Sequence, residues 1–538
     1  MTGVDSTTPL RSLVDRTPHG YTVLTTGASD YEDGSEDIVA LFLEHAQDRG
    51  PLSDELTMAA RTWPERYHLD RARANVLRGL SLPADAVVLE IGCGSGAVTS
   101  HLARVCAAVD AVEPVVARAR GAAARTRDLD NVEVFVGTVD DVPAGPAYDL
   151  VVVVGVLEYV AAGGNDDRPY VDFLRALHER LRPGGSLVLA IENQLGVKYL
   201  CGSPEDHTGI AWDGVNGYPA GGVARTFTRA RLLRLLTAAG FTTADALTAF
   251  PDYKLTRAVL TDRLLAEQAR LAEALPHWPS PDWAGPSERT VDERRLWHEL
   301  VDAGLAAAHG NSFLVLAGKD IGSGPLWPDG VLASYFSTDR AAVFCTQARV
   351  EDSADGLVIR RELLAGNADE THGVRVVPSV ERVRDAPTAM ELMLAEPGRA
   401  AELLTLWQDT VRRLADELGP RLWDLTPQNL LVTQGDPVPI DTEWSVRDCS
   451  VQTVLARGVL ITADQLSRAG HGIGDTVEDT VRALAAMIDL PADTVLAATA
   501  DEARFQAIRL VGPSDPADLA VRVDQMREAW RVRLAEPA

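Results

Sequence analysis

A glycine-rich loop is the segment of this sequence with the clearest capacity to bind a ligand. Residues 87–103 read VVLEIGCGSGAVTSHLA, an apolar run that reaches Glu90 and continues through Gly92, Gly94 and Gly96. Glycines let a backbone turn sharply and approach a ligand without a Cβ atom in the way. A helix that starts behind such a loop presents free N–H groups. The segment therefore predicts a strand, a ligand-binding loop and a helix.

Acidic and small residues follow the next three expected strands. Glu113 closes the second strand, about 20 residues after the glycines, where a carboxylate can bind ribose hydroxyls. Asp140 follows the third strand and is a candidate partner for an adenine amino group, while Gly155 and Leu157 follow the fourth. We expect these residues to line the crevice at the carboxyl ends of parallel strands, where open α/β sheets place their ligands. Glu90 is a candidate partner for a cationic amino group of the same ligand.

The order and spacing of these motifs resemble class I S-adenosylmethionine-dependent methyltransferases. The resemblance rests on EIGCGSG, AVEP, GTVDD, YDLVVVVGVLEYV and LRPGG, across residues 86–191. The resemblance implies S-adenosyl-L-methionine as cofactor. Glu90 and the three glycines would form the loop that binds this cofactor, and Glu113 would bind its ribose. One departure is Thr138, where many members of the family have an aspartate beside the adenine. On the glycine loop alone, a nucleotide-binding sheet without methyl transfer is an alternative.

Polar residues after the fifth expected strand are candidates for acting on a methyl acceptor. Transfer to a hydroxyl requires removal of its proton, which suits a side chain with a pKa near neutrality. We predict His207 as the base, with Asp206 or Glu205 orienting it; the alternative is two solvated loop acids beside an incidental histidine. The residues predicted to contact the acceptor are Glu192, Asn193, Asp252, Tyr253 and Lys254. For the last three, a purely structural turn is an equal alternative.

Lysine is rare in this chain, which makes its positions informative. Lys198, Lys254 and Lys319 are the only lysines among 51 basic residues. The first two lie in the unusual segments LGVKY and PDYKL. Because lysine and arginine are not interchangeable at a site, this placement indicates a chemical role, with chance as the alternative.

The nature of the acceptor rests on a second resemblance. The segments AIENQLGVKYLCGSPEDHTG, RTFTRARLLRLL, FPDYKL and YHLDRARANVL resemble a bacterial methyltransferase group found with surface-polysaccharide and glycan assembly genes. The resemblance implies a sugar or glycoside hydroxyl as acceptor. A small-molecule O- or N-methyltransferase of secondary metabolism fits the same cofactor motifs, and a scaffold that binds no cofactor is a further alternative.

The last third of the chain carries a second set of chemical residues. WDLTPQNLLV and PIDTEW contain Asp424, Asn429 and Asp441. They resemble the catalytic loop and metal-binding acid of aminoglycoside-phosphotransferase-like kinases, which implies ATP and Mg²⁺ as candidate cofactors. However, no glycine-rich phosphate loop is visible, and Arg360 and Arg361 stand where a kinase keeps its lysine. An active phosphotransferase, a degenerate kinase-like domain and an unrelated domain all remain open.

Alternating apolar strands and helices predict an α/β fold of the Rossmann-like type, with a mostly parallel, doubly wound sheet. We expect an acidic N-terminal extension over residues 1–60. A methyltransferase domain then follows over residues 61–320, with a helical lid insertion at 255–308. A C-terminal α+β domain, kinase-like or accessory, is expected over residues 329–538.

Composition narrows the range of partners. The formal net charge of −27 repels a phosphate backbone, so we expect a small-molecule or glycan substrate and no nucleic acid. The chain has no uninterrupted apolar run of about 18 residues and no signal-peptide pattern, so we predict a cytoplasmic protein without a membrane span. Its five cysteines contain no CxxC pair, and no metal site is predicted. The sequence leaves the oligomeric state open.

Overall fold

The computed structural model describes residues 7–13, 20–25, 34–161, 166–219, 221–222, 224–275, 278–283, 287–367 and 369–538. The chain divides into two compact units. The first comprises residues 1–336 with 349–352, and the second comprises 337–348 with 353–538. Parts of the expected N-terminal extension, residues 1–6, 14–19 and 26–33, lie outside the described residues.

Six parallel strands form one half of the sheet in the first unit, in the order β1-β4-β3-β2-β5-β6. They are β1 (Tyr21–Val23), β2 (Val87–Ile91), β3 (Ala108–Glu113), β4 (Val132–Val136), β5 (Tyr148–Val154) and β6 (Leu181–Glu192). Parallel neighbours require crossover connections, which helices supply here. The order reverses at β2, so the carboxyl ends of β2 and its two neighbours border a crevice. The predicted Rossmann-like, mostly parallel sheet is confirmed.

Four antiparallel strands extend the sheet beyond β6. They are β9 (Ser312–Gly318), β7 (Thr243–Phe250), β8 (Ala258–Leu260) and β10 (Val331–Ser337), in that spatial order. Strand β8 falls inside the segment expected to be helical from residue 255. Its three apolar residues are fully buried between β7 and β10, and this tertiary pairing overrides the local pattern.

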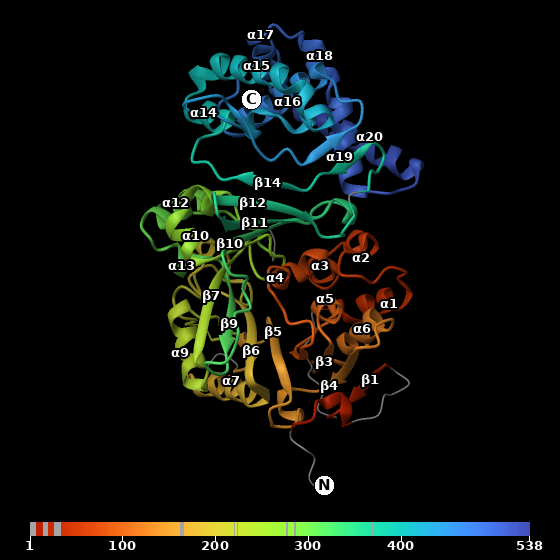
Figure 1. The fold of residues 1–538 in the computed structure, drawn as a ribbon, viewed down its shortest axis with the longest axis vertical. Coiled ribbons are helices and arrows are strands. Elements are labelled where there is room, and N and C mark those ends of the chain that lie inside the picture. The colour runs from red at the N-terminus through yellow and green to blue at the C-terminus, as the bar shows by residue number, and fades with distance from the viewer. Residues whose placement is uncertain are drawn as a thin grey trace. The chain divides into compact units, whose positions relative to one another are not determined.

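Helices cover both faces of this sheet (Figure 1). The side chains of β5 alternate between them: Val151 and Val153 pack with α7 and α9, whereas Leu150 and Val152 pack with α5 and α6. The helices of the first unit are α1 (Glu36–His45), α2 (Asp54–Ala59), α3 (Trp63–Leu69), α4 (Asn75–Arg78), α5 (Ala97–Val105), α6 (Val116–Thr126), α7 (Arg168–Arg180), α8 (Val197–Leu200), α9 (Arg229–Ala239), α10 (Asp262–Glu267), α11 (Ala269–Glu273), α12 (Glu293–Asp302) and α13 (Ala306–His309). This arrangement leaves the carboxyl ends of the parallel strands open for a ligand.

The second unit begins with short strands and continues with long helices. Its strands are β12 (Gly356–Leu363), β13 (Val374–Val376), β14 (Ser379–Arg382), β15 (Leu430–Leu431), β16 (Val438–Pro439) and β17 (Trp444–Val446), and β11 (Thr346–Ser353) is divided between the units. Its helices are α14 (Ala389–Ala395), α15 (Ala400–Leu418), α16 (Val451–Arg468), α17 (Val477–Met487), α18 (Ala492–Ala497), α19 (Thr499–Val511) and α20 (Pro516–Leu534). Trp407 is fully buried in one of its hydrophobic clusters, and its ring packs so closely on Gly458 that a Cβ there would lie 2.2 Å from it. Over the whole described part of the chain, no helix combines the length and apolar character that a membrane crossing requires.

Candidate functional site

A cavity of about 860 Å³ lies in the first unit at the carboxyl ends of β2, β3, β4 and β5. Its wall combines the glycine loop with acidic, aromatic and lysine side chains from distant segments. The lining includes Trp63, Tyr67, Glu90, Gly92, Gly94, Glu113, Asp140, Gly155, His207, Tyr253, Lys254 and Trp283. Such a volume is in the range of small-molecule and cofactor sites.

The loop between β2 and α5 requires its glycines. Gly92, Gly94 and Gly96 have φ angles of 78°, 54° and 77°, in the left-handed region that side chains disfavour. A Cβ on Gly92 would lie 2.3 Å from Val156, and one on Gly96 would lie 3.0 Å from the backbone of Ala122. The loop therefore places its backbone close to the cavity and to α6 at the same time.

Glu113, the last residue of β3, fastens this loop. Its carboxylate accepts hydrogen bonds from the backbone N–H of Gly94 at 2.8 Å and of Val115 at 3.0 Å. Burial raises the pKa of Glu113, while Arg118 and the two N–H donors oppose that rise. Each carboxylate oxygen retains a second lone pair that can accept from a ligand hydroxyl.

Glu90 is a buried acidic residue next to this loop. It is 3% exposed, and its Oε2 atom has no hydrogen-bond partner among the residues that the structure describes. Burial raises the pKa of Glu90 to about 8, so the free protein holds this carboxyl protonated at pH 7. A buried carboxyl with a free oxygen facing a cavity is suited to receive a cationic group of a ligand.

Binding of S-adenosylmethionine is expected to release a proton from Glu90. We predict that the ammonium group of this ligand contacts Glu90. Such a cation favours the ionised carboxylate, so the pKa of Glu90 should fall from about 8 in the complex. By linkage, affinity then rises with pH between about 6 and 7.5, below the range where an α-amino group itself titrates. Calorimetric titration at pH 7 in two buffers of different ionisation enthalpy counts the released protons. Glu90→Gln should bind without proton release; equal proton counts in both proteins would contradict this role.

The other predicted cofactor residues occupy different positions. Gly155 has a φ of 72°, and a Cβ there would lie 2.5 Å from the Tyr253 hydroxyl oxygen, so its wall position requires glycine. Asp140 is exposed at the rim of the cavity. Leu157, by contrast, is buried in the hydrophobic core.

A buried network of charged side chains forms one end of the cavity. The Nζ atom of Lys198 lies 2.9 Å from Asp206, and that of Lys254 lies 2.7 Å from Asp206 and also contacts Glu192. Burial alone would raise the pKa of Glu192, but Lys254 and His207 overcome it and hold this pKa below its usual range. The two rare lysines thus lie in one network.

His207 faces Glu192 in this network, which differs from the predicted arrangement. Its Nε2 atom lies 3.6 Å from Glu192 Oε2, and its Nδ1 atom lies 3.1 Å from the Tyr159 hydroxyl. Asp206 binds the lysines instead, and Glu205 accepts the backbone N–H groups of His207 and Thr208. Burial would lower the pKa of His207, but the facing Glu192 carboxylate raises it to about 9.

Two residues predicted to contact the acceptor are engaged in structural hydrogen bonds. Asn193 donates from its amide to the backbone oxygens of Ala308 and Gly310, both at 2.8 Å. Asp252 accepts from the Leu255 backbone N–H at 2.9 Å and from the Trp283 indole. Trp283, whose segment the sequence offered either as a surface for a sugar ring or as a packing residue, lines the cavity. Trp63 and Tyr67, to which the sequence gave no acceptor role, line it as well.

The second unit brings Asp424, Asn429 and Asp441 into one region. Asn429 donates to the Asp424 backbone oxygen at 2.9 Å. Burial, with Asp441 and Glu443 nearby, raises the pKa of Asp424. Asp441 has a φ of 53° and forms an ion pair with Arg361, which also contacts Glu443 at 3.2 Å. The kinase-like assignment and its ATP and Mg²⁺ stay predictions.

Parts of this chain are similar to known methyltransferases. A model of the methyltransferase domain family matches residues 65–246. Protein-L-isoaspartate O-methyltransferase of Nitrobacter winogradskyi is 36% identical over 120 residues, which are 22% of this chain and 49% of that protein. Ubiquinone biosynthesis O-methyltransferase of a Methylobacterium species is 32% identical over 113 residues, which are 21% of this chain and 43% of that protein. The chain thus spans about half, or less, of the length of these curated relatives.

One solved structure is similar to this chain with a lower sequence identity. Haemonchus contortus phosphoethanolamine N-methyltransferase 2, in complex with S-adenosyl-L-methionine, is 13% identical with a TM-score of 0.30, covering 52% of this chain and 59% of that one. Residues 65–246 thus match the model of a methyltransferase domain family, and the strands within them belong to a Rossmann-like sheet.

Proposed function

We propose that this protein transfers the methyl group of S-adenosylmethionine to a hydroxyl of a sugar or glycoside. One observation carries the proposal: the glycine loop with its Glu113 clamp and the network around His207 line the same cavity. A cofactor cradle and a polar group suited to act on a second molecule are the two parts that methyl transfer requires.

The residues of the cradle fit the cofactor. The unpartnered Glu90 oxygen suits an ammonium group, Glu113 suits ribose hydroxyls, and the exposed Asp140 suits an adenine amino group. When bound, S-adenosylmethionine supplies an electrophilic methyl group on a sulfonium. The cavity then has to hold an acceptor oxygen in line with that methyl group and exclude water.

The network around His207 is the part that would activate the acceptor hydroxyl. His207 and Lys254 line the cavity, and Glu192 lies behind them. Asp206 and Glu205 are supporting residues in this proposal, since the first holds the lysines and the second holds the backbone of the loop. Trp63 and Trp283, stacked with ring centroids 4.0 Å apart, add an aromatic surface against which a sugar ring can pack.

An acceptor screen with isotopically labelled S-adenosylmethionine tests the proposal. Labelled methyl groups should appear on sugars or glycosides. His207→Ala should lower the rate of transfer about 10²–10⁴-fold, while S-adenosylhomocysteine affinity stays unchanged. Methylation of phenols or amines with no turnover of sugars would favour the alternative, a small-molecule O- or N-methyltransferase.

A further inference from the structure

Three side chains beside the cavity share an unusual pattern of hydrogen bonds. Each has one polar atom held by a partner: Glu158 by the Tyr253 hydroxyl at 3.2 Å, Glu192 by Lys254, and His207 by the Tyr159 hydroxyl. In each, the second polar atom has no hydrogen-bond partner among the described residues; these atoms are Glu158 Oε2, Glu192 Oε2 and His207 Nε2. Glu192 Oε2 and His207 Nε2 face each other at 3.6 Å, beyond hydrogen-bond distance. Buried polar atoms are nearly always satisfied, so unbonded atoms on three neighbouring side chains require an explanation.

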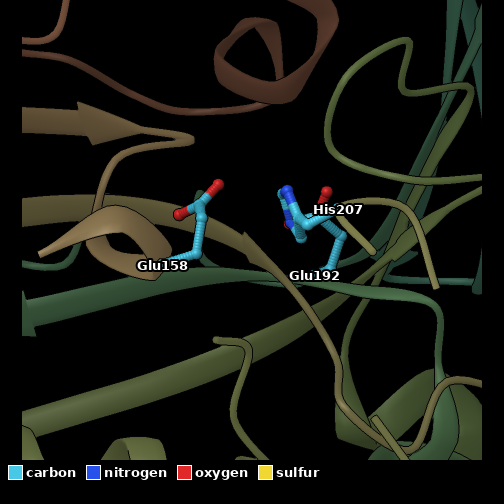
Figure 2. A group of neighbouring side chains, drawn as sticks. All are labelled: Glu158, Glu192 and His207. Carbon is cyan, nitrogen blue, oxygen red and sulfur yellow. The ribbon is translucent and has the colours of Figure 1, made fainter. Parts of the chain in front are cut away.

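The three side chains meet at one place. One ligand atom from each lies within 4.8 Å of the other two, although Glu158 belongs to the turn after β5, Glu192 ends β6, and His207 lies in the loop after α8. Figure 2 shows the Glu158 carboxylate on one side and the Glu192 carboxylate with the His207 ring on the other. Both glutamates are 0% exposed, and the His207 side chain is 6% exposed. Water therefore offers these atoms little compensation.

The Glu158 carboxyl is the one carboxyl of this network without an ion-pair partner among the described residues. Lys198 and Lys254 contact Asp206 and Glu192, and His207 faces Glu192, whereas Glu158 is held by the Tyr253 hydroxyl. A buried carboxylate without a charged partner is costly, so a cation seated between Glu158, Glu192 and His207 would stabilise the ionised form of Glu158.

We propose that Glu158, Glu192 and His207 bind a divalent cation of the Mn²⁺ or Zn²⁺ type. One imidazole and two carboxylates form a mixed nitrogen and oxygen donor set, which suits these ions better than the all-oxygen sets of Mg²⁺ or Ca²⁺. In a tetrahedral site, ligand atoms about 2.0–2.2 Å from the ion lie roughly 3.3–3.6 Å apart, so these side chains need to approach one another by up to roughly 1.5 Å.

The hydrogen-bond partners of these three side chains are of the kind that usually surrounds metal ligands. A metal-binding histidine commonly hydrogen-bonds through its other ring nitrogen, and ligating carboxylates are held in turn by donors. Tyr159, Tyr253 and Lys254 occupy these positions here. The role of the cation, though not its binding, rests on the proposed function. A hydroxyl that coordinates such a cation loses its proton to solvent water more readily, so His207 would act on the acceptor as a ligand rather than as the base.

Metal titration of the full chain tests this proposal without using activity. Chelator-treated protein is titrated with Mn²⁺, followed by electron paramagnetic resonance, and with Zn²⁺, followed by calorimetry. We expect one ion per chain. Glu158→Gln, which keeps the side-chain shape, should bind at least 100-fold more weakly, as should His207→Gln. Tyr253→Phe, which removes an outer partner, should bind about tenfold more weakly.

Two controls separate this outcome from other causes. S-adenosylhomocysteine binding reports that each variant is folded, and it tests the proposed function independently of the metal. Asp441→Asn removes the candidate metal-binding acid of the second unit and should leave ion binding unchanged. The proposal is overturned if neither ion binds stoichiometrically, if binding persists in both Glu158→Gln and His207→Gln, or if Asp441→Asn abolishes it.

Discussion

Replacing Glu113 by alanine is expected to weaken S-adenosylhomocysteine binding about 100- to 1,000-fold. The carboxylate makes two hydrogen bonds to the loop backbone, at Gly94 and Val115, and is the proposed partner of the ribose. Hydrogen bonds to charged groups are worth about 1.5–3 kcal/mol each. Losing the loop's shape and a ligand contact together removes roughly 3–4 kcal/mol, at about 1.4 kcal/mol per factor of ten in affinity. Isothermal titration calorimetry measures the effect.

Two variants control this experiment. Glu113→Gln keeps one acceptor oxygen and should retain intermediate affinity. Glu133→Ala changes a half-buried glutamate on the neighbouring strand β4, which does not line the cavity, and should bind within about twofold of wild type. If Glu113→Ala bound as tightly as wild type, Glu113 would have no part in the cofactor site.

Replacing Lys254 by methionine is expected to destabilise the first unit by about 3–5 kcal/mol. Lys254 is 7% exposed and pairs with both Glu192 and Asp206. Methionine has a similar length, so the main effect is the loss of a buried cation that leaves two carboxylates short of charge. Removing one member of a buried ion pair is costly because the remaining charge stays buried. Methyl transfer should be lost as well.

Denaturant unfolding measures this change, provided that the transition of the first unit is identified. Because a ligand stabilises the unit that binds it, this transition is the one that S-adenosylhomocysteine shifts to higher denaturant. Lys319→Met is the matched control: Lys319 is half-buried and donates to the Leu181 backbone oxygen, so its loss should cost about 1 kcal/mol. Equal destabilisation by the two substitutions would show that the ion pairs of Lys254 do not contribute to the stability of the first unit.

The parallel half of the sheet could be predicted from sequence because it depends on local signals. Strand β5 is apolar apart from Asp149 and is followed by Gly155, and β2 runs directly into the glycine loop. Strand β8 could not be predicted in this way. Its three residues, Ala258–Leu260, are too few to show a period, and they form a strand because neighbouring strands on both sides supply hydrogen bonds.

The residues of the candidate site also differ in how far local sequence signals could predict them. Glu90, Glu113 and the glycines were predictable because they lie at fixed offsets from strand ends. The partner of His207 could not be predicted, because Glu192 is 15 positions away in sequence and comes close to His207 only through the fold. The scarcity of lysine did carry a signal: Lys198 and Lys254 both proved to be buried in the charge network.

Calorimetric titration of the wild-type protein with S-adenosylmethionine and S-adenosylhomocysteine tests the central claim most directly. We predict saturable binding of both compounds with one site per chain. No heat of binding from either compound, with protein shown to be folded by circular dichroism, would contradict the assignment of the cavity as a methyl-donor site.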